Sequence, residues 1–139
     1  MTTTNSIRRV DYYHATVKDE PGVAYQILNQ LAEMGLNLQA LTVIPVGLHT
    51  TQMTLFPEDG QSFAGLAKQI GLTIQGPFQA ILVQGNDKIG ALSEIHKVLF
   101  LANVNVYASS GVSDGKGSFG YVVYVRPEAF GRAAEALGI

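Results

Sequence analysis

Apolar residues recur every three or four positions in two stretches of the chain, with polar residues between them. This is the spacing of an amphipathic helix that buries one face. Gly35 and Asn103 follow the two stretches, and both residue types tolerate the left-handed conformation that ends many helices. The recurring residues are Val23, Ile27, Leu31 and Met34, with Ala24 and Leu28 beside them, and then Ala91, Ile95, Leu99 and Ala102.

Runs rich in β-branched and aromatic residues flank both predicted helices, which indicates strands. Asp114-Gly115 predicts a hairpin turn in the second half, and a further helix is expected after Pro57 and after Pro127. Each half therefore reads βαββα, and the last strand of the first half makes it βαββαβ. The expected strands cover residues 11–17, 36–43 and 72–75, and then 79–84, 104–109 and 119–125.

The two halves are an internal repeat. Asp19-Glu20-Pro21-Gly22-Val23-Ala24 aligns with Asp87-Lys88-Ile89-Gly90-Ala91-Leu92 at an offset of 68 residues. Gly35-Leu36-Asn37-Leu38 aligns with Asn103-Val104-Asn105-Val106 at the same offset. The hairpin of the second copy is then expected to be two residues longer than that of the first, which aligns Pro57 with Pro127. The repeat predicts two domains, residues 1–76 with an N-terminal arm and residues 77–139.

The predicted fold class is α+β: two tandem ferredoxin-like βαββαβ sandwiches, each an antiparallel sheet with helices on one face. The sequence ends at Ile139, where the fourth strand of the second copy is expected to begin. A missing strand leaves an open sheet edge, which proteins usually cover. We expect residues 6–10 to pair there as the fourth strand.

Composition excludes several classes of protein. The chain has 139 residues, of which 47% are hydrophobic, no cysteine, and a formal net charge of −2. These values favour a packed cytoplasmic protein without disulfides and argue against an electrostatic nucleic-acid binder. No apolar run is long enough to span a membrane. Only 14% of residues are charged, against roughly 25% in typical soluble domains, so we expect a homo-oligomer, such as a dimer, that covers part of the surface.

The repeated turn resembles a known family. Asp19-Glu20-Pro21-Gly22-Val23, followed by an amphipathic helix and Gly35-Leu36-Asn37-Leu38, is similar to the signature of the ACT domain, and the second copy keeps Asp87 and Gly90 but has Ile89 in place of proline. The resemblance covers nearly the whole chain as two copies. It implies a regulatory module that binds amino acids at interfaces between paired domains, without a cofactor and with a possible partner enzyme.

The turn is chemically suited to such a ligand. The start of a helix presents unpaired N–H groups to a carboxylate, and Gly22 and Gly90 let a ligand approach the backbone. Asp19 and Asn86 can accept hydrogen bonds from an ammonium group, and the resemblance implies that strands after the helices form the facing wall. The expected contact residues are Asp19, Glu20, Pro21, Gly22, Val23, Asn37, Leu38, Leu41, Asn86, Asp87, Lys88, Ile89, Gly90, Ala91, Asn105, Ser109 and Ser110.

Other functions are less well supported. The same glycines and aspartates also occur as plain turn and cap residues, so a dimerising or enzyme-docking scaffold without a ligand is the alternative. Gly115-Lys116-Gly117-Ser118 lies on a hairpin and does not match a phosphate loop. No nucleophile–base pair or metal spacing is evident; His96 is expected to be a hydrogen-bonded, partly buried residue. The sequence therefore predicts no enzyme activity.

The third strand of the second copy predicts a surface for self-association. Phe119, Tyr121, Val123 and Val125 alternate with Gly120, Val122 and Tyr124, so the second set is expected to face outward. Leu101 also stands on the helix where the first copy has Glu33. Apolar residues at positions that the first copy solvates indicate a face covered by another copy.

Overall fold

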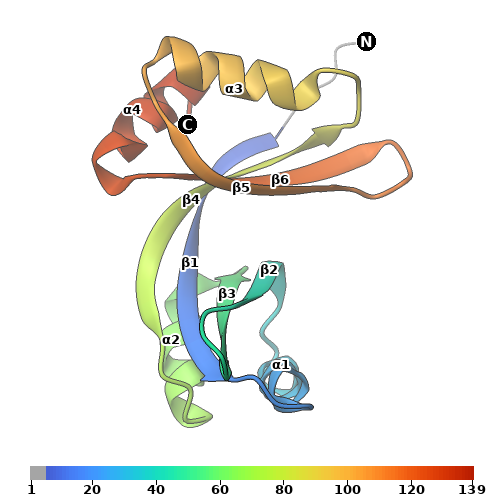
Figure 1. Cartoon of the computed structure of the whole chain (residues 1–139), viewed down its shortest axis with the longest axis vertical. Helices are drawn as coiled ribbons and strands as arrows, with labels where there is room; N and C mark the ends of the chain where they lie inside the picture. Colours follow the sequence, from blue (N-terminus) through green and yellow to red (C-terminus); the bar gives the residue numbers. More distant parts are fainter. Residues whose placement is uncertain (1–5) are drawn as a thin grey trace. The chain divides into compact units, whose positions relative to one another are not determined.

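The computed structural model describes residues 6–139, which form two compact units (Figure 1). The first unit contains residues 11–78, and the second contains residues 79–139 together with residues 6–10. The element bounds are β1 Ser6–Lys18, α1 Val23–Glu33, β2 Leu38–Pro45, β3 Thr50–Pro57, α2 Gly60–Gln69, β4 Gln75–Asn86, α3 Ala91–Leu101, β5 Val106–Ser113, β6 Ser118–Val125 and α4 Pro127–Leu137.

Strands β1 and β4 are longer than expected, and each contributes a part to both units. The strand order is β2-β3-β1-β4-β6-β5. Strand β3 pairs antiparallel with β1 and β2, and β6 pairs antiparallel with β4 and β5. The first unit therefore has the order β2-β3-β1-β4, and the second has β1-β4-β6-β5. Each is the ferredoxin-like arrangement predicted from the sequence, with helices on one face of the sheet.

Residues 6–10 supply the fourth strand of the second unit, as the sequence predicted. Ile7 packs against the core of that unit. Arg8 donates a hydrogen bond to Gln84 Oε1 at 2.9 Å, and the Arg9 guanidinium lies 5.9 Å from the ring centroid of Phe130. The N-terminal segment thus groups with the second unit, whereas the expected boundary at residue 76 placed it with the first.

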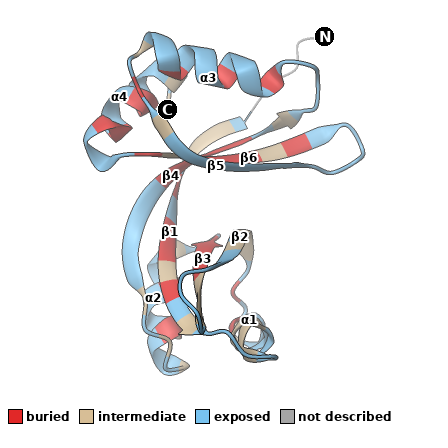
Figure 2. Ribbon diagram, in the orientation of Figure 1, coloured by how far each residue is buried: buried red, intermediate tan, exposed pale blue. Residues whose placement is uncertain are grey.

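Each unit buries its own core between helices and sheet (Figure 2). The helix faces are those that periodicity predicted: Leu31 is buried in the first unit, and Ala91, Ile95 and Leu99 are buried in the second. Gly35 and Asn103 have φ values of 79° and 57°, which confirms both as left-handed residues after a helix. The two amphipathic patterns therefore place the helices correctly.

Three local expectations were wrong. The two hairpins are equally long. Val46 N–H donates to Thr50 O in the first, and Asp114 N–H donates to Ser118 O in the second, so each loop closes over the same number of residues. A helix follows Pro57 as expected, but Pro57 ends β3 whereas Pro127 begins α4, so the expected alignment of the two prolines is wrong. Helix α2 begins at Gly60, where the carboxylate of Asp59 accepts hydrogen bonds from two backbone N–H groups. Residues 72–74 are not a strand; they pack Leu72 and Ile74 against the core on the way to β4.

The outward set of β6 is less exposed than expected. Phe119, Tyr121, Val123 and Val125 belong to the core as predicted. Val122 was expected to be a solvent-facing residue, but it is only 8% exposed within the single chain. It therefore offers little free surface for a partner. No helix among residues 6–139 is long and apolar enough to cross a membrane.

The strand formed by residues 6–10 leads to a first prediction. Replacing Ile7 with Asn removes an apolar group from the second core and should lower the free energy of unfolding by about 1–2 kcal/mol, less than for a fully buried isoleucine. Ser6→Asn is the control, because Ser6 is exposed. Urea unfolding combined with amide exchange checks this, and equal stability of the two variants would contradict the strand assignment.

Candidate functional site

Each of the helices α1 and α3 follows an N-cap glycine in the left-handed conformation. Gly22 has a φ of 86° and Gly90 a φ of 85°, and neither helix start has a side-chain cap. The two turns are held alike, because Asp19 N–H donates to His49 O and Asp87 N–H donates to Gly117 O, both at 2.8 Å. The positive φ explains why glycine occupies both positions.

The first turn of α3 leaves backbone donors available. Ala91 N–H donates to Lys88 O at 3.1 Å, and the intrahelical ladder resumes with Glu94 N–H to Gly90 O. The N–H groups of Leu92 and Ser93 lie between these bonds, where an α-helix offers no internal acceptor. This end of the helix also carries its partial positive charge. It is therefore suited to an anionic group.

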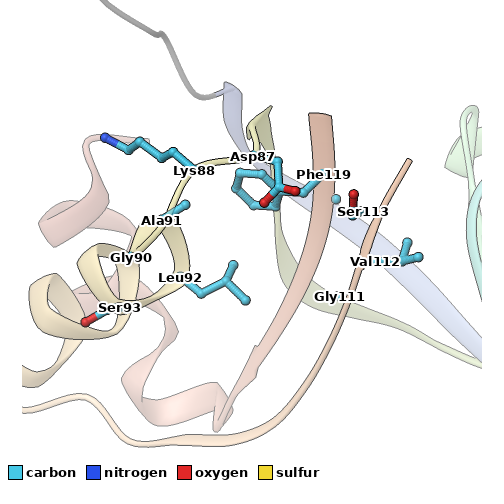
Figure 3. Close-up of a pocket in the computed structure, with 11 residues that line it drawn as sticks. Asp87, Lys88, Gly90, Ala91, Leu92, Ser93, Gly111, Val112, Ser113 and Phe119 are labelled. Carbon is cyan, nitrogen blue, oxygen red and sulfur yellow. The ribbon is translucent and has the colours of Figure 1, made fainter. Parts of the chain in front are cut away.

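A pocket of about 410 Å³ opens beside this turn, between α3 and the strands β5 and β6 (Figure 3). Leu92 extends from α3 toward the strands (Figure 3), and Asp87 and Phe119 both line the pocket. Lys88 points away, and its Nζ lies 3.5 Å from Glu94 Oε2. The lining residues are Asp87, Lys88, Gly90, Ala91, Leu92, Ser93, Gly111, Val112, Ser113, Phe119 and Gly120.

The pocket brings together some of the expected contact residues and adds others. Asp87, Lys88, Gly90 and Ala91 line it, whereas Ile89 is fully exposed. Sequence reasoning missed the lining residues of β5 because it ended that strand at residue 109, and it assigned Phe119 and Gly120 of β6 to the core and to the outward face. The strand runs to Ser113, and the glycine and serines in this stretch had the composition of a turn.

The other expected residues of the second unit lie outside the pocket lining. Asn86 ends β4 and Asn105 precedes β5, and both are exposed. Ser110 pairs with Val122, so alternation along the strand directs its side chain away from the helix side. Ser109 faces the helix side and accepts a hydrogen bond from Tyr121.

In the first unit the expected residues are spread over several elements. Asp19, Glu20, Pro21 and Gly22 are exposed in the turn before α1, and Val23 is half-buried at the helix start. Asn37 lines a smaller pocket of about 250 Å³ beyond the other end of α1, together with Glu58, Asp59 and Ser62. On β2, Leu38 packs against the core and Leu41 is 38% exposed.

A hydrogen-bonded trio lies next to the pocket of the second unit. The Tyr121 hydroxyl donates to Ser109 Oγ at 2.8 Å and lies 2.7 Å from His96 Nε2. Tyr121 is buried, whereas Ser109 and His96 are exposed. His96 is thus hydrogen-bonded as expected but more open to solvent. A Cβ at Gly111 would lie 2.7 Å from Tyr121 Cδ1, so the ring occupies the space that a side chain there would need.

The three histidines do not form a common site. His14 lies beside the rings of Tyr12 and Phe78 and contacts Thr54 Oγ1 at 3.1 Å, and burial lowers its pKa. His49 lies in the hairpin of the first unit. Within residues 6–139 no group of three or more His, Asp or Glu side chains is placed to hold a metal ion.

Comparison with known proteins reveals related folds only among solved structures. No family model matches the chain, and no curated protein matches it. Protein BT0572 from Bacteroides thetaiotaomicron superposes with a TM-score of 0.80 at 13% identity, over 95% of this chain and 88% of that chain.

Regulatory subunits of aspartate kinase are also similar. The ligand-free subunit from Thermus thermophilus gives a TM-score of 0.62 at 13% identity, over 96% of this chain and 94% of that chain. The subunit from Thermus flavus gives 0.60 at 13% identity, over 99% and 95%. At these identities the likeness establishes the fold. The chain therefore has an ACT-like fold in two tandem copies.

The close approach of Tyr121 to Gly111 leads to a second prediction. Gly111→Ala should lower the free energy of unfolding by about 1–3 kcal/mol, because the new methyl group displaces the ring. In a Tyr121→Met background the flexible side chain can move aside, so the same substitution should cost less. A double-mutant cycle from urea unfolding measures this coupling. Additive effects would show that the ring does not fill the space at Gly111.

Proposed function

We propose that this chain is a non-catalytic regulatory protein that binds a free amino acid, or a similar small carboxylate, at the turn before α3. The observation that carries the proposal is the 410 Å³ pocket at the Gly90 turn. The ACT-like fold supports it, because two similar structures are described as regulatory subunits of aspartate kinase. By analogy, the partner that responds to the ligand is an enzyme.

The charges around the turn match both ends of a zwitterion. The N–H groups of Leu92 and Ser93 are positioned for the carboxylate. Asp87 lines the pocket. The neighbouring cation, Lys88, forms its ion pair with Glu94, so within the described chain the Asp87 carboxylate has no ion-pair partner. It can therefore receive the ammonium group. Each charge-assisted hydrogen bond contributes roughly 1.5–3 kcal/mol, so a few of them suffice for micromolar affinity.

The two equivalent glycines provide a matched test of where the ligand binds. Gly90→Val should abolish binding, because a branched side chain at positive φ strains the turn and fills the approach to the N–H groups. Gly22→Val imposes the same strain on the other turn, and neither new Cβ meets another atom within 4 Å. Thermal-shift screening with the twenty amino acids, followed by calorimetry on both variants, gives the result.

The comparison separates the possible outcomes. Loss of binding in Gly90→Val with retention in Gly22→Val is the expected result. The reverse would place the ligand at the first unit. If the wild-type chain binds no amino acid, the regulatory proposal fails and the ligand-free scaffold replaces it.

A second role, self-association, is favoured by the exposed face of α3. Phe100 and Leu101 are 75% and 71% exposed, and the aligned residues of the first copy are Ala32 and Glu33. Large apolar side chains at such exposure are typical of surfaces that a partner covers. We propose that a second copy of the chain covers them in a homodimer.

Leu101→Glu restores the residue type of the first copy and tests this role. The change should shift a dimer toward monomer at micromolar concentration, because covering a charge in an apolar interface is unfavourable. Light scattering coupled to gel filtration measures the mass. Glu33→Gln, on the equivalent helix, is the control and should leave the mass unchanged. A wild-type chain that is already monomeric would exclude the homodimer.

A further inference from the structure

The trio of His96, Tyr121 and Ser109 lies next to the pocket. Each member is on an element that lines the pocket (α3, β6 and β5), close along that element to a lining residue. His96 follows Leu92 by one helical turn, about 6 Å along α3. Ser109 and Tyr121 are each two residues from Gly111 and Phe119 on the same strand faces, about 7 Å away. Because Leu92, Gly111 and Phe119 line the pocket, the trio forms its next layer.

The first copy has only apolar residues at the equivalent positions. At the offset of 68 residues, Leu28, Leu41 and Met53 correspond to His96, Ser109 and Tyr121, and Val43 corresponds to Gly111. The strand registers agree with this alignment, since Leu41 pairs with Leu55 and Ser109 with Val123. An apolar trio therefore suffices to build this layer of the fold.

The four differences form one set. The Tyr121 ring needs the space that a side chain at position 111 would take. Its hydroxyl needs partners, because a buried polar group without a hydrogen bond is costly, and Ser109 and His96 provide them. Stability alone gives no reason for exchanging apolar residues for a polar network beside the pocket, so the set indicates a role in recognition.

We propose that the trio determines ligand specificity, by hydrogen-bonding the end of a ligand side chain that terminates in a carboxamide. This inference rests on the proposed function, which places the amino and carboxylate groups of the ligand at the turn before α3. The side chain then passes Leu92, Gly111 and Phe119 and reaches the exposed edges of His96 and Ser109.

The free hydrogen-bonding capacity of the trio fits a carboxamide. Because the Tyr121 hydroxyl donates to Ser109 Oγ, the hydroxyl hydrogen of Ser109 is available for a carbonyl oxygen. When His96 Nε2–H donates to Tyr121, the other ring nitrogen is an acceptor for an amide N–H. A carboxamide offers both groups and carries no charge. The distance of about 6–7 Å from the pocket residues to the trio suits a side chain of glutamine length.

Calorimetry on the full-length chain with L-glutamine and L-methionine tests the inference, because the two side chains are similar in length and differ in hydrogen bonding. The wild type should bind glutamine at least about tenfold more tightly than methionine, the effect of roughly one hydrogen bond. Tyr121→Phe should remove most of that preference. The triple variant H96L/Y121M/S109L, which restores the residue types of the first copy, should prefer methionine.

Tyr13→Phe is the matched control. Tyr13 is a buried tyrosine of the first unit whose hydroxyl donates to Gly60 O at 3.1 Å. Its replacement removes the same atom as Tyr121→Phe, far along the chain from the pocket residues. It should leave the preference for glutamine unchanged.

The possible outcomes separately test the role of the trio, the carboxamide assignment and the proposed function. A wild type that binds methionine as tightly as glutamine, or a preference that survives Tyr121→Phe, overturns the role of the trio and leaves the proposed function intact. Tighter binding of L-glutamate than of L-glutamine overturns the carboxamide assignment. Absence of binding by every amino acid overturns the proposed function itself, and the inference with it.

Discussion

The left-handed glycine at the start of α3 is the constraint on which the site depends. With φ at 85°, Gly90 turns the chain from β4 directly into the helix without a side-chain cap. The first helical N–H groups are consequently left open, beside a pocket bounded by β5 and β6. A residue with a Cβ is strained in this conformation. The same geometry recurs at Gly22, so the turn is a property of the repeated fold.

What differs between the copies lies around the turn. In the second unit the neighbouring residues are Leu92, Gly111 and Phe119, and His96 and Tyr121 are hydrogen-bonded to each other behind them. In the first copy Val43 and Met53 stand at the positions of Gly111 and Tyr121. The same turn geometry is thus surrounded by different side chains in the two copies. In the proposed function, specificity resides in these side chains, because backbone N–H groups bind any carboxylate alike.

Much of the fold followed from local patterns in the sequence. Helix faces came from the spacing of residues such as Leu31 and Leu99, because the core selects an apolar stripe with the helical period. The role of residues 6–10 followed from an open sheet edge. The equal hairpins and the start of α2 did not follow, because the aligned prolines Pro57 and Pro127 occupy different elements. A proline restricts φ but does not identify the element that contains it.

The site was only partly predictable for a physical reason. Asp87 and Gly90 belong to a short motif that the repeat makes visible. The far wall of the pocket consists of Gly111, Val112 and Ser113, which reach the turn only through the register of β5 with β6. Such long-range pairing leaves no local signal in the sequence. The network of His96 and Tyr121 likewise joins residues 25 positions apart.

The proposed function requires that the N–H groups at the start of α3 hold a ligand carboxylate. An amide-resolved NMR titration of the 139-residue chain with L-glutamine tests this contact. The largest saturable shifts are expected at the amides of Gly90, Ala91, Leu92 and Ser93, with smaller changes on β5. Saturable shifts confined to other parts of the chain, or no saturable shift with any of the twenty amino acids, would contradict it.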